Sequence, residues 1–366
     1  MDSAANRLLL GTRKGLMIFE RSERGWDKHS HHFAGVAIAY SIFDERTGLL
    51  WACQDHGHWG QKLSCSADWG TTWQDCAVPA YPEGAEISEG KPATLRYLWV
   101  LQPGHADQPD TLWAGTEPGG LFVSHDRAKS WQLVESLWNH PSRAKGWFGG
   151  GRDDAGIHSV VIDPRDARHM FIAVSCAGVF ETTDGAQSWH PRNTGLNADF
   201  LPDPAAEVGQ DPHFMVAAPG DPDTLWQQNH CGIYMSRDGA KTWQMVSEDG
   251  GPAHFGFAVA VDPHCPERAW VVPATSDQNR IAIDGALCVC RTDDGGENWK
   301  RQSKGLPQEG CFDIAYRHAL DIAGATLAFG STTGNAWLSE DLGESWDCLG
   351  TALPPVYSVR FANHAG

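Results

Sequence analysis

The sequence of 366 residues carries a formal net charge of −18 at pH 7, and 41% of its residues are hydrophobic. Nucleic acids and anionic membranes are bound by basic surfaces, so this charge argues against both as partners. The 40 glycines and 21 prolines favour a chain with many turns over one built from long helices.

The sequence shows no signal for a membrane span or for secretion. No apolar run is long enough to cross a bilayer, and no basic stretch with a long apolar core follows Met1. The ten cysteines are scattered apart from Cys288 and Cys290, whose spacing is not that of a zinc site. We therefore expect reduced thiols and a cytoplasmic protein.

One turn pattern recurs along the whole chain. Each copy contains Ser or Thr, an Asp two residues later and a closing Trp; the six copies span residues 66–73, 124–131, 182–189, 236–243, 292–299 and 339–346. A seventh copy ends at Trp26 and lacks the aspartate. A repeat of roughly 50 residues is typical of propellers and solenoids. We expect each Asp to accept N–H groups of its own turn, and each Trp to anchor its unit in the core.

Short strand-like runs separate the turns. In one unit these runs are residues 158–164, 169–174, 178–182 and 188–191. Their apolar composition and the turn residues between them predict four antiparallel strands in each unit. Units of four strands arranged around an axis are the blades of a β-propeller.

The two ends of the chain complement each other. The first unit opens at Arg7 without a first strand, and the chain ends with an unused strand-like run from Pro355 to Phe361. We expect the last strand to complete the first blade and close the ring, since this leaves no exposed strand edge. The sequence thus predicts an all-β fold, a seven-bladed β-propeller with Asp-box repeats, in a single domain over residues 1–366.

The connections between units differ in length. Those after Trp73, Trp131 and Trp189 are long, and those after Trp243 and Trp299 are shorter. Long loops in compact domains usually carry function. We expect the long ones to wall one side of the propeller's face with Trp138, Trp147, Phe148, Asp153, Asp154, Phe200 and Glu207.

Histidines in register in neighbouring units give the main functional signal. Counting back from the repeat prolines places His158 and His213 in one column, which also holds Tyr97 and Phe257. Counting back from the repeat aspartates places His230 at the matching turn of its unit. We expect the three histidines to converge from two adjacent blades at the mouth of the central funnel. The neighbours expected there are Glu117, Asp211, Gln228 and Asn229.

Three interpretations of these histidines stay open. Three imidazoles with a carboxylate or amide can bind a divalent metal that polarises a substrate oxygen or activates water. Alternatively, one histidine acts as a general base beside a charged partner. In the third interpretation they only hydrogen-bond strand ends and water in the channel. In each case we expect them to line the main pocket.

Other polar groups are weaker candidates. His56, His58 and Trp59 either extend the site or form a solvated loop with an aromatic lid. Glu117 paired with Asp55, Asp153 or Asp211 could supply the two carboxyl groups of a glycosidase. Guanidinium groups suit carboxylate ligands, which nominates Arg13, Arg96, Arg143, Arg152 and Arg280. The remaining candidates for substrate contact are Tyr97, Trp147 and Tyr357.

The turn pattern resembles the Asp box, or bacterial neuraminidase repeat, of sialidases. Runs at residues 11–16, 114–122, 158–164, 191–196, 228–232 and 353–359 resemble a bacterial family of Asp-box propellers that are described as sialidase-like or glycosyl hydrolase proteins. The resemblance covers essentially the whole chain and implies the propeller fold and a hydrolase activity. The Phe/Tyr-Arg-Ile-Pro motif of true sialidases is absent, and Tyr357 matches their late tyrosine without an identifiable glutamate partner.

Two functions are consistent with these features. One is a hydrolase, glycosyl hydrolase-like, or a lyase for a small polar, carbohydrate-like or carboxylated substrate. His158, His213 and His230 would then be catalytic or bind a divalent metal, with Glu117 or Asp211 assisting. The other is a non-catalytic scaffold that recognises a protein or glycan through the long-loop face. The expected partner is a small-molecule or carbohydrate ligand, and the sequence does not indicate an oligomeric state.

Overall fold

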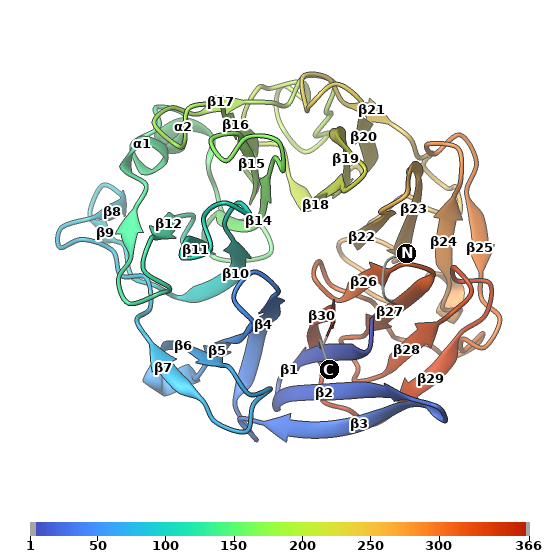
Figure 1. Cartoon of the computed structure of the whole chain (residues 1–366). Coiled ribbons are helices and arrows are strands. Elements are labelled where there is room, and N and C mark those ends of the chain that lie inside the picture. The colour runs from blue at the N-terminus through green and yellow to red at the C-terminus, as the bar shows by residue number, and fades with distance from the viewer. Residues whose placement is uncertain (1–4, 364–366) are drawn as a thin grey trace. The chain divides into compact units, whose positions relative to one another are not determined.

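The computed structural model describes residues 5–363, and residues 1–4 and 364–366 lie outside the described part. The first residues of the segment expected to lack a secretory signal are among those outside it. In residues 5–363, seven sheets contain four strands each. One additional hairpin pairs β8 (Glu86–Ser88) with β9 (Lys91–Pro92). The predicted all-β architecture with seven four-stranded blades is confirmed (Figure 1).

The chain divides into two compact units, which we describe separately. The first comprises the described residues up to Ser41 together with those from His213 onward, and the second comprises Ile42–Pro212. The boundaries fall within β4 (Ala37–Asp44) and after the first residue of β18 (Pro212–Ala218). The single domain over residues 1–366 stays a prediction.

In the first unit, one blade is built from both ends of the chain. Strand β1 (Arg7–Thr12) pairs with β2 (Gly15–Ser22) on one side and with β30 (Val356–Ala362) on the other. The outer strand is β3 (Gly25–His32) (Figure 1). Every residue of β1 is buried, so its backbone groups need partners at both edges. The predicted completion of the first blade by the C-terminal strand is confirmed.

Three further blades follow in this unit. Their strands are β18 with β19 (Asp221–Asn229), β20 (Gly232–Ser236) and β21 (Gln244–Met245); β22 (Gly256–Asp262), β23 (Cys265–Pro273), β24 (Val289–Thr292) and β25 (Lys300–Gln302); and β26 (Leu320–Ala323), β27 (Thr326–Gly330), β28 (Ala336–Ser339) and β29 (Asp347–Gly350). A short 3-10 turn, η2, covers Ile283–Gly285. The connection after Trp299 is longer than predicted, because regular pairing resumes only at Leu320.

The second unit holds the three long loops. Its strands are β5 (Leu49–Asp55), β6 (Gln61–Ser66) and β7 (Gln74–Cys76), which pair in the sheet of β4; β10 (Tyr97–Pro103), β11 (Leu112–Glu117), β12 (Leu121–Ser124) and β13 (Gln132–Leu133); and β14 (Gly156–Ile162), β15 (Met170–Ser175), β16 (Gly178–Thr182) and β17 (His190–Pro191). The helices are η1 (Gly57–Trp59), α1 (Glu135–Trp138) and α2 (Arg143–Gly146). No helix in residues 5–363 is long and apolar enough to span a membrane.

The Asp-box turns satisfy their own polar groups, as predicted. In the first copy, Asp68 accepts the backbone N–H of Thr72 at 2.8 Å and its hydroxyl at 2.7 Å. Gly70 N–H donates to the hydroxyl of Ser66 at 2.7 Å. The backbone N–H and then the hydroxyl of Thr72 hold the pKa of Asp68 below its usual range. The corresponding carboxylates are bonded in the same way at Asp126, Asp184, Asp238, Asp294 and Asp341.

Two of the closing tryptophans, Trp131 and Trp299, join neighbouring blades. The indole N–H of Trp131 donates to the carbonyl of Ala77 at 2.8 Å, just after the outer strand of the preceding blade. In the other unit, Trp299 makes the equivalent bond to Val246 at 2.7 Å. The indole thus buries apolar area while its polar N–H caps the end of an outer strand. The anchoring role predicted for these residues is confirmed at both positions.

Candidate functional site

One ring nitrogen of His213 is held by a backbone carbonyl. His213 is the second residue of β18 and is nearly fully buried, with Nδ1 2.6 Å from the carbonyl oxygen of Gly256. A carbonyl can only accept, so the neutral ring carries its proton on Nδ1 and its lone pair on Nε2. The ring also stacks on Phe257, with centroids 4.6 Å apart and planes 18° apart. This fixed ring has the tautomer and the outer hydrogen bond that a metal-binding histidine needs.

His230 lies in the tight turn between β19 and β20. The side-chain oxygen of Asn229 accepts the N–H of Cys231 at 3.1 Å. Gly232 closes the turn at a φ of 130°, a conformation that other residues rarely adopt. This geometry brings the imidazole of His230 to 5.5 Å from that of His213, centroid to centroid. His230 is partly exposed, so a ligand can reach it.

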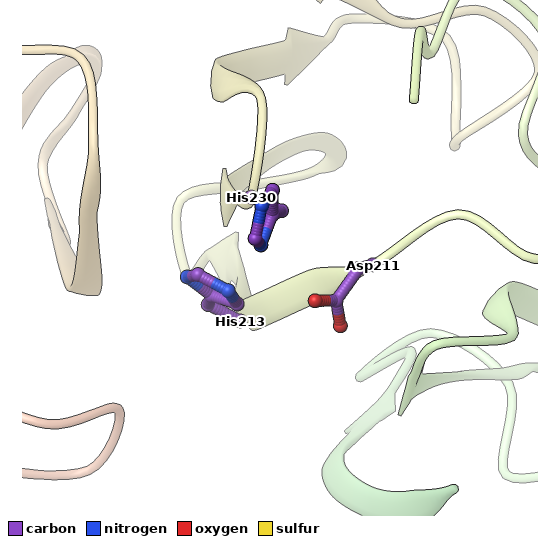
Figure 2. A group of neighbouring side chains, drawn as sticks. All are labelled: Asp211, His213 and His230. Atoms are coloured by element: carbon purple, nitrogen blue, oxygen red, sulfur yellow. The ribbon is translucent and has the colours of Figure 1, made fainter. Parts of the chain in front are cut away.

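Asp211 lies just before Pro212, which begins β18. Its Oδ1 accepts the backbone N–H of Cys176 at 2.9 Å and the hydroxyl of Ser175 at 3.2 Å, which orients the carboxylate. One ligand atom each from Asp211, His213 and His230 lies within 4.8 Å of the others (Figure 2). Two imidazoles and a carboxylate are a donor set that zinc and other divalent transition metals accept. We call these three residues the Asp–His–His group.

His158 hydrogen-bonds the start of a neighbouring strand, as the third interpretation of the histidines describes. It is fully buried in β14, with Nε2 2.8 Å from the carbonyl of Pro212 and Nδ1 2.9 Å from the hydroxyl of Ser159. Because a carbonyl only accepts, Nε2–H is the donor there and Nδ1 accepts from Ser159. Both ring nitrogens are therefore engaged. His158 supports the backbone between Asp211 and His213 and offers no lone pair of its own.

Two residues predicted to contact substrate instead shape the turn that carries His230. The side-chain amide of Gln228 donates to the carbonyl of His254 at 2.8 Å and to that of Gly232 at 3.3 Å. Asn229 is fully buried, and its amide nitrogen donates to the side chain of Gln227 at 3.1 Å. The amide nitrogens of Gln228 and Asn229 serve local structure, whereas Oε1 of Gln228 is buried without a hydrogen-bond partner in residues 5–363. His230 and Cys231 are the partly exposed residues of this turn.

Glu117 belongs to an ion-pair network within Ile42–Pro212. It is buried at the end of β11, where its carboxylate contacts Arg152 at 2.7 Å and Arg96 at 3.6 Å. The guanidinium of Arg152 also lies 3.9 Å from the ring centroid of Tyr97. Four of the predicted site residues thus gather here, and the two arginines offset the charge of Glu117.

The same network contains a second carboxylate. Asp154 pairs with Arg96 and, at 2.7 Å, with Lys91. Burial acts to raise the pKa of Asp154, but Lys91 and Arg96 outweigh it and hold that pKa below its usual range. A glycosidase acid needs a raised pKa. The carboxylate of Asp154, close to Glu117, is therefore held ionised and suits a structural role better than proton donation.

The other predicted contacts have varied surroundings. His58 and Trp59 lie in η1, where Trp59 is 73% exposed, as in a solvated loop with an aromatic tip. Trp147 is half-buried, with its indole N–H donating to Ser142 at 3.2 Å. Asp55, at the end of β5, accepts the side-chain amide of Gln61 at 2.9 Å. The remaining predicted residues are His56 beside η1, exposed Asp153 in the second long loop, exposed Arg13 in the β1–β2 turn and partly buried Tyr357 in β30.

Sequence reasoning missed Asp277. Its Oδ2 lies 3.9 Å from Nε2 of His230, and its side chain is exposed. Asp277 lies in the connection between β23 and β24, which is much longer than the corresponding connection in any other blade. Alignment of one unit against another could not place it. An unusually long inner loop next to a predicted site residue was the available signal.

Comparison with known proteins places the chain among glycoside hydrolase-like propellers. It is 26% identical over 280 residues to an oligoxyloglucan-reducing end-specific xyloglucanase of Emericella nidulans, which covers 69% of this chain but only 32% of the relative. The crystal structure of an ancestral GH74 enzyme superposes on 99% of the chain and 40% of its own, with a TM-score of 0.58 and 14% identity. No family model matches.

A second solved structure, which is not named as a glycoside hydrolase, resembles the chain to a similar degree. YCF48 from Cyanidioschyzon merolae superposes on 91% of the chain and 92% of its own, with a TM-score of 0.52 and 14% identity. At such identities the solved structures show the fold alone. The relatives named here support a glycosyl hydrolase-like propeller, and none of them is named as a sialidase. The chain spans about a third of the length of the curated xyloglucanase.

Proposed function

We propose that this protein is a metal-assisted hydrolase or lyase that acts on a small carbohydrate-like substrate at the Asp–His–His group. The observation that carries the proposal is the meeting of three ligand atoms within 4.8 Å. Similarity to a xyloglucanase over 69% of the chain supports the carbohydrate part. Three protein ligands with one open position are the arrangement of catalytic rather than structural zinc sites.

The donor atoms available are consistent with a divalent ion. Nε2 of His213 carries the lone pair, because Gly256 fixes the proton on Nδ1. His230 supplies the second imidazole, and Asp211 supplies a carboxylate that Cys176 and Ser175 orient. A divalent ion bound here would polarise a substrate oxygen or lower the pKa of water.

Asp277 is the proposed proton acceptor. It is the carboxylate at 3.9 Å from His230, and it lies on an exposed loop rather than in a buried ion pair. A general base must come within hydrogen-bond reach of the proton it removes, either directly or through one water. A loop position allows the carboxylate to close that gap when substrate binds. Removal of a proton from water would then start hydrolysis. Removal of a proton from a substrate carbon next to a carboxyl or carbonyl group would start elimination, with the oxygen on the neighbouring carbon as the leaving group.

Metal analysis of protein purified without an affinity tag tests the proposal. We expect one divalent ion per chain, a lower melting temperature with chelator, and loss of the ion when His213 and His230 are both replaced by alanine. His58→Ala, at an exposed loop, is the matched control and should keep the ion. Wild-type protein that stays metal-free after incubation with zinc and manganese would contradict the proposal.

A non-catalytic scaffold is the second candidate. Phe148 and Phe200, both in the long loops, are 38% and 41% exposed and pack edge to face at 6.4 Å. Exposed aromatic pairs suit binding of a protein or a sugar face. Glycan binding that Phe200→Ser abolishes, together with unchanged binding in the His213 and His230 double variant, would favour the scaffold over the hydrolase.

A further inference from the structure

Two arginines lie beside the Asp–His–His group. The aromatic ring on which His213 stacks, Phe257, has the guanidinium carbon of Arg280 at 5.4 Å and that of Arg317 at 5.7 Å from its centroid. Phe257 also follows Gly256, whose carbonyl holds His213. One short strand segment therefore positions both the proposed metal ligand and two cationic groups.

Arg280 is an exposed arginine in the connection between β23 and β24. Its Nε donates to the backbone carbonyl of Asp277 at 2.9 Å, and it forms no ion pair within residues 5–363. By contrast, Arg268 contacts Asp293 at 2.5 Å, and Arg291 contacts Glu344 at 3.0 Å. Within residues 5–363 Arg301 of the same blade also forms no ion pair, so what distinguishes Arg280 is its place over the ring of Phe257. The two terminal nitrogens of Arg280 present a planar fork to solvent.

The charges around the group favour a negatively charged ligand. Two carboxylates, Asp211 and Asp277, belong to the group and its edge. A divalent ion and two guanidiniums outweigh them, so the local balance is positive once metal is bound. The net negative charge of the chain disfavours anions, so positive charge close to the ligand has to offset that repulsion.

We infer that the substrate is an acidic sugar or a related carboxylated polyol. Its carboxylate is held by Arg280 with the help of Arg317, while neighbouring oxygens face the Asp–His–His group. Guanidinium recognises a carboxylate through two parallel N–H bonds, and its flat face packs on an aromatic ring. This inference rests on the proposed function, and it narrows the substrate from carbohydrate-like to anionic.

Calorimetry with matched sugars tests the inference. Galacturonate, galactose and galactose 6-phosphate have the same sugar ring and differ only at C6. That carbon carries a carboxylate, a neutral hydroxymethyl group or a phosphate ester, respectively. Zinc-loaded wild type should bind galacturonate at least about tenfold more tightly than galactose, which corresponds to one charge-assisted contact. Arg280→Gln should lose that preference and keep its zinc affinity. The control Arg24→Gln removes an exposed arginine from the β2–β3 turn and should behave as wild type.

Each outcome separates this inference from the proposed function. Equal binding of galactose and galacturonate, or binding of neither, in zinc-loaded wild type overturns the inference and leaves metal binding intact. Preference for galactose 6-phosphate that Arg280→Gln removes supports the arginine site and assigns the anion to a phosphorylated sugar. Absence of zinc from wild type overturns the proposed function. A galacturonate preference that depends on Arg280 in that zinc-free protein would support the inference alone.

Discussion

His158 and His213 occupy the same position in neighbouring repeats, yet their rings are used differently. His158 is followed by Ser159, whose hydroxyl engages Nδ1, and its Nε2 donates to the carbonyl of Pro212. His213 is followed by Phe214 and donates through Nδ1 to Gly256, which leaves the lone pair on Nε2. The repeat determines where each side chain starts. The residues around it decide which ring atom remains for chemistry.

The largest expected difference between the two histidines is in metal affinity. His213→Ala removes a proposed ligand, so we expect zinc affinity to fall by more than about a hundredfold, the upper range for loss of an outer partner. His158→Ala removes only support for the Pro212 backbone and should cost about tenfold or less. Isothermal titration calorimetry measures both. Equal losses in the two variants would show that the environments do not separate the roles.

The reverse order is expected for stability. His158 is fully buried with both nitrogens bonded and its ring 5.7 Å from Trp99, so His158→Ala leaves a cavity and an unpaired carbonyl. We expect a loss of about 2–4 kcal/mol in the free energy of unfolding. His213→Ala also removes a buried ring and its bond to Gly256, but this ring lies beside the partly exposed His230, so we expect a smaller cost of about 1–3 kcal/mol. Urea unfolding in chelator, where metal cannot contribute, compares them; a larger loss at His213 would reverse the assignment.

The Asp-box turns can be compared with the two histidines, because their carboxylates accept hydrogen bonds from residues of the same turn. The hydroxyl of Ser130, followed by its backbone N–H, lowers the pKa of Asp126 to about 2. A lowered carboxyl pKa stabilises the fold fully above the unfolded value, about 3.9, and this stabilisation disappears as pH falls through the folded value.

Asp126→Asn should therefore cost most above about pH 4, and its difference from wild type should shrink toward pH 2. Urea unfolding at a series of pH values measures this small effect. Asp249→Asn, at an exposed position, is the control and should differ little from wild type at any pH. A cost at Asp126 that does not vary with pH would mean that the hydrogen bonds do not depend on its charge.

The fold could be predicted from the sequence because the same turn pattern occurs six times along the chain. Six in-phase turns establish the unit, and a missing first strand at Arg7 with a spare strand at the end implies their pairing. A local pattern that recurs needs no knowledge of distant contacts. His213 and His230 were placed for the same reason, since each occupies a column of the repeat.

The rest of the site depends on contacts that no repeat encodes. The bond of His158 to Pro212 joins residues of different units of the repeat and is invisible to column counting. Asp277 lies in an insertion, and Arg317 lies in the irregular segment before β26. Glu117 looked catalytic by position, yet Arg152 neutralises it from a long loop. Insertions and long loops are where alignment by period gives no information.

The pairing of β1 with β30 has a consequence for biosynthesis. The ribosome makes β1 well before β30, so the first blade stays incomplete while the residues between Thr12 and Val356 are translated. During that time β1 offers an open edge of apolar residues such as Leu8 and Leu10, a template for pairing with other nascent chains. A stalled or truncated translation product that lacks Val356–Ala362 should therefore be a preferred client of chaperones.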